Sequence, residues 1–418
     1  MAFTGRRGYA TAMRIVDVCA FYTPLGGGVR TYVESKLRAA PGMGYEQIVI
    51  APGERHEVRK VGPGAILATI PGPTLALDRR YHYFNDETML HRELDRWNPD
   101  HVEATSPWAS ASMVSRWQGS ATRSLVMHSD PLSAFAYRWL GGIMSRRMID
   151  RICNPFWNHL RALDREFDVV VAPSRQLADR LRAGGVEKAI SIPLGVERGR
   201  FDPDFRDEKL RAELLATLGL PPSGVLLIGL GRFSSEKRWE MVIRAVAEAS
   251  RKKPVGLLLV GDGPRRQTLD LASARFSNIE LLMPVTDRDE LARLVASADA
   301  VVHGCEAETF GLTISEARAS GVPVIVPNRG GASEQLCPGA GLAYRAGSER
   351  SLTRAILAFV QRDPAAQRRV AVQSSRVRTM EEHFAQLFSC YSALAARPVP
   401  LPAIDTAIAP AAAASAVY

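Results

Sequence analysis

The sequence predicts an α/β protein built from two doubly wound parallel sheets. Short apolar runs rich in Val, Ile and Leu alternate with amphipathic helical patterns, and this alternation occurs in two successive sets. The runs are continuously apolar, as in strands that helices cover on both faces. Strands that alternate with helices favour parallel sheets. The chain has 418 residues, enough for two or three domains.

The expected strands can be placed one by one. They are the segments 13–20, 45–52, 101–106, 124–129, 169–174 and 189–194 in the first set, and 225–231, 256–263, 279–284, 300–304 and 322–327 in the second. The helical pattern is clearest at 241–249, where the apolar residues fall on one helix face.

A charged segment at 197–210 separates the two sets and is the expected linker. We therefore expect a first domain at 13–196 and a second domain at 197–375. The two ends of the chain are expected to be flexible, the second because it is rich in Pro and Ala, at 1–12 and 397–418.

Composition and charge exclude several classes of function. Apolar residues make up 46% of the chain, no apolar run reaches the 18 or so residues of a membrane helix, and the first dozen residues lack the apolar segment of a signal peptide. Five cysteines without CxxC spacing argue against a disulfide framework or zinc site and favour a cytoplasmic, reducing setting. The net charge of +9 suits anionic partners, but the chain has no recognisable nucleic-acid-binding module.

Three glycines in PLGGGVRTYV, residues 24–33, follow the first expected strand and open an amphipathic helix. Glycines such as Gly27 and Gly28 let the backbone approach a ligand closely, and a helix start offers free N–H groups to an anion. The segment is therefore a candidate phosphate site. The alternative is a flexible turn that binds nothing.

The segment GLGRFSSEKRWEM, residues 229–241, joins a strand to a helix and carries Arg232 and Lys237. Two cations at a helix entrance can hold a diphosphate through charge-assisted hydrogen bonds without a metal. The alternative is a pair of solvated surface cations. The segment is not a complete dinucleotide fingerprint, because Ser234 stands where a third Gly or Ala is needed, which argues against a dehydrogenase.

Two other strand ends carry candidate residues. Gly261 and Gly263 form a sharp turn in LLVGDGP at the carboxyl end of a strand, where open α/β sheets bind ligands. His128 follows another apolar strand directly. Each has a plain alternative, since such turns also serve only as turns and a lone histidine is often structural.

Two acids bracket a Phe-Gly corner in ETFGLTISEARASGVPVIVP, residues 308–327. Glu308 is expected in a loop, where a carboxylate can accept hydrogen bonds from sugar hydroxyls. Glu316 is expected in a helix that ends at Gly321, from which it can reach a ribose. The alternative is two unrelated acids on a surface helix.

Taken together and in this order, these motifs resemble the retaining glycosyltransferases of family 4, which have the GT-B fold of two Rossmann-like domains facing a cleft. The resemblance covers about residues 13–395. Its most specific element is the E-x7-E motif in ETFGLTISE, and its other elements are ARASGVPVIV, NRGGASE, GRFSSEK, VGDGP, SRQLADRL and GGGVRTYV. A departure is Leu194, where relatives commonly have Asn.

The resemblance implies a function for each domain. The second domain would bind a UDP- or GDP-sugar, the first would face the acceptor, and a helix at 376–396 would pack back on the first domain. A hexose would pass to a hydroxyl group by front-face substitution, without a metal or other cofactor. No carboxylate pair for double displacement is evident. A fixed cation at the leaving group is typically worth ~3 kcal/mol or more.

The resemblance also implies a role for each candidate residue. Arg232 and Lys237 would hold the diphosphate, while Glu308 would hold the transferred sugar and Glu316 the ribose. His128 would lie near the reacting carbon. The remaining donor-binding positions would be Gly27, Gly28, Gly261, Gly263, Phe310, Gly311 and Leu312.

The acceptor is suggested by residues 138–165, which hold six arginines against two acids, with large apolar residues interleaved. A basic, aromatic-rich helix of this kind suits a surface that sits on anionic lipid headgroups. The alternative is a helix packed on its own sheet with its arginines solvated. We expect a lipid or lipid-linked glycan acceptor and a peripheral location on the inner face of the cell membrane.

Two rival functions fit the same architecture. A non-hydrolysing nucleotide-sugar epimerase would share the cleft but should not need the ETFGLTISE arrangement. A non-catalytic nucleotide-sugar-binding subunit would not need to keep the charged set of Arg232, Lys237, Glu308 and Glu316.

Overall fold

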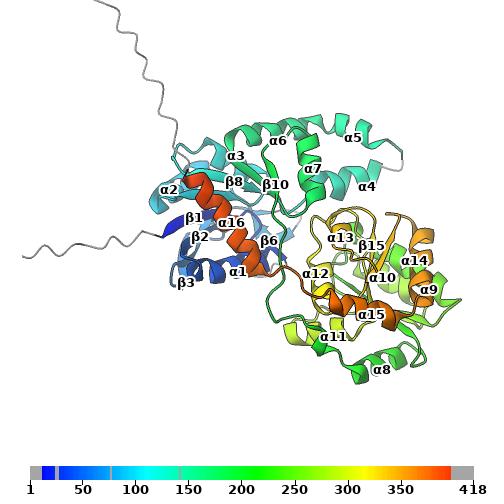
Figure 1. Cartoon of the computed structure of the whole chain (residues 1–418). Coiled ribbons are helices and arrows are strands. Elements are labelled where there is room, and N and C mark those ends of the chain that lie inside the picture. Colours follow the sequence, from blue (N-terminus) through cyan, green and yellow to red (C-terminus); the bar gives the residue numbers. More distant parts are fainter. Residues whose placement is uncertain (1–11, 24–27, 76–77, 141–142, 397–418) are drawn as a thin grey trace, which may run out of the picture.

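The computed structural model describes residues 12–23, 28–75, 78–140 and 143–396, which form two lobes, each built around one large sheet (Figure 1). The first sheet has eight strands. In spatial order they are β10 (Ala189–Ser191), β9 (Val169–Ala172), β8 (Thr122–Val126), β7 (His101–Ala104), β1 (Met13–Val18), β2 (Tyr45–Gly53), β4 (Ala65–Pro71) and β3 (Glu57–Gly62).

Helices and a small hairpin complete the first lobe. The helical elements are α1 (Gly28–Gly42), α2 (Glu87–Trp97), α3 (Ala109–Arg116), the π-helical turn η1 (Leu132–Ala136), α4 (Tyr137–Leu140), α5 (Arg146–Ile152), α6 (Asn154–Glu166) and α7 (Arg175–Ala183). A separate two-stranded sheet pairs β5 (Thr74–Leu75) with β6 (Asp78–His82).

The second lobe contains a six-stranded parallel sheet. In spatial order its strands are β13 (Ile279–Leu282), β12 (Val255–Val260), β11 (Val225–Leu230), β14 (Ala300–Val302), β15 (Val324–Pro327) and β16 (Gly341–Tyr344). Its helical elements are η2 (Pro203–Phe205), α8 (Glu208–Thr217), η3 (Ser235–Lys237), α9 (Trp239–Ser250), α10 (Arg266–Ser273), α11 (Arg288–Ser297), α12 (Leu312–Ala319), α13 (Gly331–Glu334), α14 (Glu349–Gln361) and α15 (Pro364–Gln373).

The order of the elements confirms the doubly wound α/β fold, with two corrections. Strands β3 to β6 and β16 have no counterpart among the strands expected from the sequence. The first sheet is also not wholly parallel, because β3 pairs with β4 in the antiparallel sense. Strand β3, EVRKVG, is charged and almost wholly exposed. It lacks the continuous apolar run of an inner strand because it lies at the edge of the sheet.

The last described helix crosses from the second lobe to the first. Helix α16 (Met380–Ala395) follows α15 in the sequence but packs against α1 and β8, as its position in Figure 1 shows. A parallel bridge joins Val196 to Thr379 where the two connecting segments pass each other. Gly195 is required there, because a Cβ atom would lie 2.1 Å from the backbone of Thr379.

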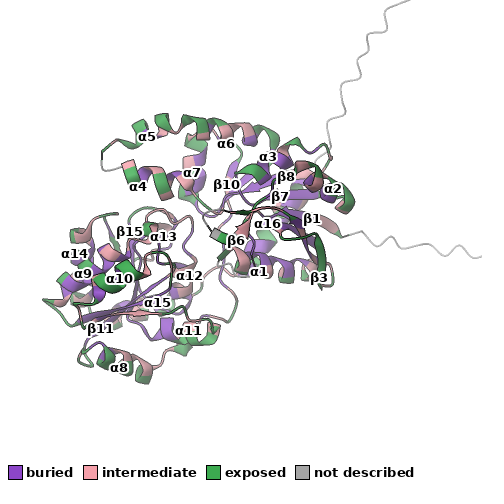
Figure 2. Ribbon diagram, turned by 180° about the vertical axis from the view of Figure 1, so that it is seen from behind, coloured by how far each residue is buried: buried purple, intermediate pink, exposed green. Residues whose placement is uncertain are grey.

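The strands form the interior of each lobe, and the outer helix faces are exposed (Figure 2). One apolar cluster of the first lobe includes Phe310 from the second lobe together with Phe384 and Phe388 of α16. Apolar contact therefore joins the lobes as well as filling them. None of the helices in the described ranges has the length and hydropathy of a membrane span.

The basic segment 138–165 is not one helix. It contains the end of α4, all of α5 and most of α6, and its apolar residues divide between two environments. Ile149 and Trp157 are buried in the core of the lobe, whereas Trp139 and Met148 are exposed. Part of the segment therefore packs on its own lobe and part is exposed, and contact of the exposed part with a lipid surface stays a prediction.

Candidate active site

The corner between the two motif glutamates is held by the backbone groups around it. Gly311 has φ +91°, which a side chain would strain, and it lies just before the first residue of α12. The Gln335 side-chain amide donates to the carbonyl oxygens of Phe310 and Gly311 at 2.7 and 3.1 Å. Gly331 packs beneath this corner, because a Cβ atom there would lie 2.3 Å from the Thr309 carbonyl oxygen. The motif thus forms one fixed turn.

Glu308 forms an ion pair with Lys237 at the end of η3. The Lys237 Nζ atom lies 2.7 Å from the Glu308 Oε2 atom, and each side chain is 21% exposed. Burial by itself raises the pKa of Glu308, but the Lys237 charge and His303 lower it well below its usual range. Burial also lowers the pKa of Lys237, but Glu308 raises it overall. Both groups are therefore charged at neutral pH.

Glu316 has a different cation as its partner. Its Oε1 atom lies 3.1 Å from an Arg288 guanidinium nitrogen at the start of α11. Burial raises the pKa of Glu316, and Arg288 opposes that rise. The sequence analysis does not identify Arg288, which lies 28 positions from Glu316 in a segment without a motif. The only signal in the sequence at this position is a charged residue that follows Asp287, the residue that caps α11.

The glycine-rich strand ends pack against each other. A Cβ atom at Gly261 would lie 2.0 Å from the Gly231 carbonyl oxygen, and one at Gly263 would lie 2.7 Å from the Phe233 carbonyl oxygen. This close backbone contact explains why glycine is needed at both positions even when no ligand is bound. Contact of the two glycines with a donor therefore stays a prediction. Arg232 lies in the same loop and is exposed. Within the described part of the chain, its guanidinium makes no hydrogen bond or ion pair, so its predicted role beside Lys237 stays a prediction.

Two candidate residues come from the first lobe. The His128 carbonyl oxygen accepts a hydrogen bond from the Thr309 hydroxyl at 2.9 Å, which places His128 beside the corner. Its ring packs edge-on against Tyr32 with ring centroids 4.8 Å apart. Burial lowers the pKa of His128 to about 4, so the imidazole is neutral at pH 7. Among the described residues, its buried Nε2 atom has no hydrogen-bond partner.

The glycine-rich start of α1 also faces the second lobe. A Cβ atom at Gly28 would lie 3.9 Å from the Leu312 side chain, which places these two predicted donor-binding residues next to each other. The prediction for Gly27 lies outside the described residues.

Hydrogen bonds join the two lobes beside the corner. The Glu334 carboxylate accepts from the backbone N–H groups of Arg175 and Gln176 at 3.0 and 2.6 Å, so an anion from the second lobe caps helix α7 of the first. The Gln176 side chain donates to Ser333 and accepts from the Gly330 N–H group. These contacts border a cavity of about 360 Å³ that both lobes line.

The cavity carries charge from both lobes. Glu308, Arg146 and Arg329 are among its lining residues. Arg180 also lines it and is neutralised by Asp130. The structure thus confirms that the two lobes face a cleft at the E-x7-E motif.

Three potential metal ligands lie close together beside the corner. The ligand atoms of His303, Cys305 and Glu308 all lie within 4.8 Å of one another. The Glu308 carboxylate is already paired with the Lys237 ammonium group. Burial raises the pKa of the Cys305 thiol to about 12, so this side chain is a thiol at neutral pH, whereas a metal binds a thiolate. The donor set therefore fits a charge-paired polar cluster better than a divalent cation.

Comparison with known families decides the assignment of the chain. A model described as "Glycosyltransferase Family 4" matches residues 26–200, and one described as "Glycosyl transferases group 1" matches residues 211–376. The two matches cover both lobes, including the cleft. This chain belongs to glycosyltransferase family 4. The family assignment favours a transferase over an epimerase or a non-catalytic subunit.

Individual proteins resemble this family-4 glycosyltransferase over most of its length. A GDP-mannose-dependent alpha-(1-6)-phosphatidylinositol dimannoside mannosyltransferase of Mycobacterium tuberculosis is 26% identical over 92% of this chain and 97% of its own. A GDP-mannose-dependent alpha-mannosyltransferase of Corynebacterium glutamicum is 28% identical over 76% of this chain and 73% of its own.

Solved structures share the GT-B fold. A sucrose-phosphate synthase from Thermosynechococcus elongatus superposes with a TM-score of 0.69, at 21% identity, over 91% of this chain and 99% of its own.

Proposed function

We propose that this glycosyltransferase moves mannose from GDP-mannose to a hydroxyl group of a lipid-linked glycan, with retention of configuration and without a metal ion. The choice of donor rests on the two bacterial relatives named as GDP-mannose-dependent. The observation that carries the proposal is the Lys237–Glu308 ion pair at the interlobe cleft. It supports the proposal because a nucleotide sugar that reacted beside this pair would have a fixed cation and a fixed carboxylate next to it.

The donor would be held mainly by the second lobe. The Lys237 ammonium group has three N–H donors, of which Glu308 uses one, so two stay free for diphosphate oxygens. Arg232 is exposed nearby in the same strand-to-helix loop and would close on the diphosphate from its other side. Glu316, fixed by Arg288, would accept hydrogen bonds from the ribose hydroxyls.

The chemistry would occur on one face of the sugar. The C1–O bond to the diphosphate breaks while the acceptor oxygen bonds to C1 from the same side. The acceptor proton passes to the departing phosphate oxygen. Negative charge grows on the leaving group, where Lys237 stabilises it, and positive charge grows on the sugar ring, where Glu308 is ionised.

His128 would contribute hydrogen bonding and not charge. Because the pKa of His128 is lowered to about 4, its imidazole is neutral throughout the physiological range. Its Nε2 atom has no partner among the described residues and is free to bond a sugar hydroxyl. The edge-on contact with Tyr32 fixes the ring in place.

The acceptor proposal rests on an exposed apolar patch beside the cleft. The patch comes from η1, α4, α5 and the segments that follow them, and consists of Phe135, Trp139, Ile143, Met148 and Ile152, which are 51–84% exposed. The exposed side chains of Arg146, Arg147 and Arg151 are interleaved with it on α5. An apolar patch with arginines at its border suits an anionic lipid surface.

Arg146 links this patch to the cleft. It lines the same cavity as Glu308 and Arg329, and its guanidinium lies 4.9 Å from the centre of the Tyr137 ring. Arg146 is exposed on one side only, and its partial burial together with the neighbouring charges of Arg329 and Arg180 lowers its pKa. The four acids that line this cavity each have a cation partner: Asp130 pairs with Arg180, Asp179 with Arg182, Glu306 with Arg238 and Glu308 with Lys237. Arg146 and Arg329 form no ion pair among the described residues, which favours an acceptor that brings an anionic group, such as a lipid phosphate, toward the cleft.

A donor screen tests the first half of the proposal. Full-length protein is incubated with GDP-mannose, UDP-glucose or UDP-galactose, with and without EDTA, and unfolding temperature and transfer to a phosphatidylinositol mannoside acceptor are measured. We expect stabilisation of ~2.7 kcal/mol at a hundred times the dissociation constant of GDP-mannose, and transfer that EDTA does not reduce. A response to UDP-sugars alone, or full loss of transfer in EDTA, would contradict the proposal.

Vesicle flotation tests the second half. We expect binding to vesicles that contain phosphatidylinositol, weak binding to neutral phosphatidylcholine vesicles, and loss of binding in the Trp139→Ser/Ile143→Ser double variant. Leu271→Ser is the matched control, because Leu271 is 71% exposed on the other lobe. Equal flotation of the patch variant and the control would remove the patch from the acceptor surface.

A further inference from the structure

A second charged pocket lies at the amino end of the second sheet, opposite the end that carries the donor motif. It has a volume of about 680 Å³ and lies where β11 begins at Val225 and where Asp299 precedes β14. Helices α8 and α15 form its other walls. The pocket is thus separate from the interlobe cleft.

One carboxylate serves two of its arginines. Arg211 bonds both oxygens of Asp299, at 2.9 and 2.8 Å, and Arg206 lies 3.5 Å from one of them. The Leu226 N–H group donates to the same carboxylate at 2.8 Å. Asp299 is only 8% exposed. Its oxygens are therefore fully used by these partners.

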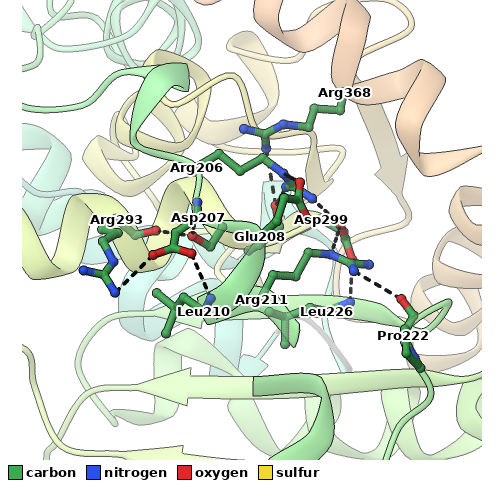
Figure 3. Close-up of polar contacts among 12 residues, drawn as sticks. Arg206, Asp207, Glu208, Leu210, Arg211, Pro222, Leu226, Arg293, Asp299 and Arg368 are labelled. Carbon is green, nitrogen blue, oxygen red and sulfur yellow. Dashed lines mark hydrogen bonds and ion pairs between the residues drawn. The ribbon is translucent and has the colours of Figure 1, made fainter. Parts of the chain in front are cut away.

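Arg368 is left without a carboxylate of its own. Its hydrogen bond within the described residues goes to the Ala298 carbonyl oxygen at 3.4 Å, an oxygen that Arg206 also uses. Figure 3 shows the side chains of Arg206, Arg211 and Arg368 gathered around Asp299. Burial and the nearby Arg206 charge lower the pKa of Arg368 to about 10, as expected for a cation held beside another cation.

Arg369 adds a fourth guanidinium at the rim. It is 69% exposed and lies 3.8 Å from Asp363, which already caps α15 through the Ala365 N–H group. Glu208 also lines the pocket and forms an ion pair with Arg206, which donates to Ala298 and Asp299 as well, so three of the five Arg206 N–H donors are used. The N–H donors that the pocket's own carboxylates leave unsaturated are therefore mainly those of Arg368 and Arg369. Planar guanidinium groups of this kind bind phosphate and carboxylate in pairs of hydrogen bonds.

We propose that this amino-end pocket binds a small polyanion, a molecule bearing phosphate or carboxylate groups, through Arg368 and Arg369, with the remaining N–H donors of Arg206 beside them. A concave pocket of about 680 Å³ suits a small molecule better than the flat surface of a membrane or the length of a nucleic acid. The site goes beyond the proposed transfer reaction, since it lies at the opposite end of the sheet from the donor motif.

The pocket lies beside both segments that connect the two lobes. Arg206 directly follows η2, where the chain arrives from the first lobe, and α15 directly precedes the segment that returns to it. At the end of α12, Gly321 lies against both Pro203 and Val372, so that helix, which carries Glu316, touches both connections. A ligand that joins Arg206 to Arg368 would hold the two connections together and restrain lobe movement.

Calorimetric titration of the full chain with inorganic phosphate, pyrophosphate and citrate tests the site. Because the donor cleft is also proposed to bind a diphosphate, each titration uses the Lys237→Ala background with and without Arg368→Gln. We expect Arg368→Gln to weaken binding about tenfold or more, because one charge-assisted bidentate contact is lost. Arg354→Gln is the matched control, an exposed arginine on α14 that does not line the pocket.

The outcomes separate the possibilities. Equal binding by Arg368→Gln and the control, or no binding of any of the three anions at ~10 mM, would overturn the inference. A shared response to phosphate and citrate indicates charge recognition, whereas a response to phosphate and pyrophosphate alone identifies phosphate esters as the ligand class. Arg369→Gln repeats the test at an exposed position if Arg368→Gln does not fold.

Hydrogen exchange locates the ligand. We expect bound polyanion to slow amide exchange at 203–211 and 364–373 in the parent and not in Arg368→Gln. Slowing confined to 308–316 would place the anion in the donor cleft and overturn the inference. Neither measurement uses turnover, so the proposed transfer reaction and this site can fail independently.

Discussion

The two lobes each contain a lysine paired with acids, and the two clusters differ in access. In the first lobe, Lys36 bonds Asp17 and Glu103, and all three side chains are 0% exposed. In the second lobe, Lys237 bonds Glu308, and both side chains are 21% exposed at the cleft. Both clusters consist of a lysine and carboxylate side chains. A ligand could reach the cluster of the second lobe but not that of the first.

We call Lys36, Asp17 and Glu103 the sealed cluster, and the Lys237–Glu308 pair the open cluster. The sealed cluster also contacts the last described helix, α16. Tyr391 of α16 donates to Glu103 at 2.7 Å, and the His101 ring stacks on the Tyr391 ring with centroids 3.8 Å apart. The cluster thus fastens the last helix to the first lobe. A lysine–carboxylate pair stabilises the fold where it is sealed from solvent, and it can take part in chemistry where it opens on a cleft.

The largest expected effect is on the sealed cluster. Lys36→Met leaves two carboxylates close together in the core without a cation, and we expect a loss of about 3–5 kcal/mol in the free energy of unfolding. Chemical denaturation of the variant measures it. Lys209→Met is the control, because the Lys209 side chain is 88% exposed. Equal stability of the two variants would break the comparison.

The open cluster should affect turnover. Lys237→Ala removes the cation proposed for the leaving group, and we expect kcat to fall by ~10²–10³. Steady-state rates with GDP-mannose measure the change, and exposed Lys252→Ala serves as the control. Full activity in Lys237→Ala would reduce this pair to a structural contact like that of Lys36.

The two clusters should respond to pH in opposite directions. Burial raises the pKa of Asp17 to about 7, so the folded state holds this proton more tightly than the unfolded state, and stability falls as pH rises from ~4 to 7. The pKa of Glu308 is raised by burial but lowered overall by Lys237 and His303. Its contribution is complete above pH ~4.3 and is lost as pH falls toward the folded pKa.

Single variants separate the pH dependence of stability that comes from Asp17 from that which comes from Glu308. Relative to wild type, Asp17→Asn should gain stability as pH rises from 4 to 7, and Glu308→Gln should lose less stability than wild type below pH 4. Each slope is at most about 1.4 kcal/mol per pH unit for one proton. Unfolding midpoints measured from pH 3.5 to 7.5 test both signs. Parallel profiles for the two variants would show that the clusters titrate alike.

The smallest expected effect is on the fastening of α16. Tyr391→Phe removes one buried hydrogen bond to Glu103, and we expect a loss of about 1–3 kcal/mol in the free energy of unfolding, at the lower end if Lys36 compensates. Tyr83→Phe is the matched control, since Tyr83 is 44% exposed. A loss of activity without a loss of stability would instead connect α16 to the reaction.

Local pattern was enough for much of the fold and for the corner of the site. The inner strands are continuous apolar runs, and the positive φ angles of Gly311 and Gly321 follow from their places at either end of α12. Strand β3 was missed because an edge strand lacks such a run, whereas β4 was overlooked although its sequence, AILATIP, is apolar. The Arg288 partner of Glu316 was missed because nothing in its neighbourhood along the chain marks it.

By itself, the sequence determined the order of strands and helices, the turn at the E-x7-E motif and the kinds of charged residue that surround it, because these depend on neighbours a few positions apart. Only the tertiary structure decided which of those charges are sealed and which face the cleft. Glu103 and Tyr391 meet across 288 positions, and Thr309 meets His128 across 181. Burial, and with it the pKa of each group, depends on such distant neighbours, and no local pattern records them.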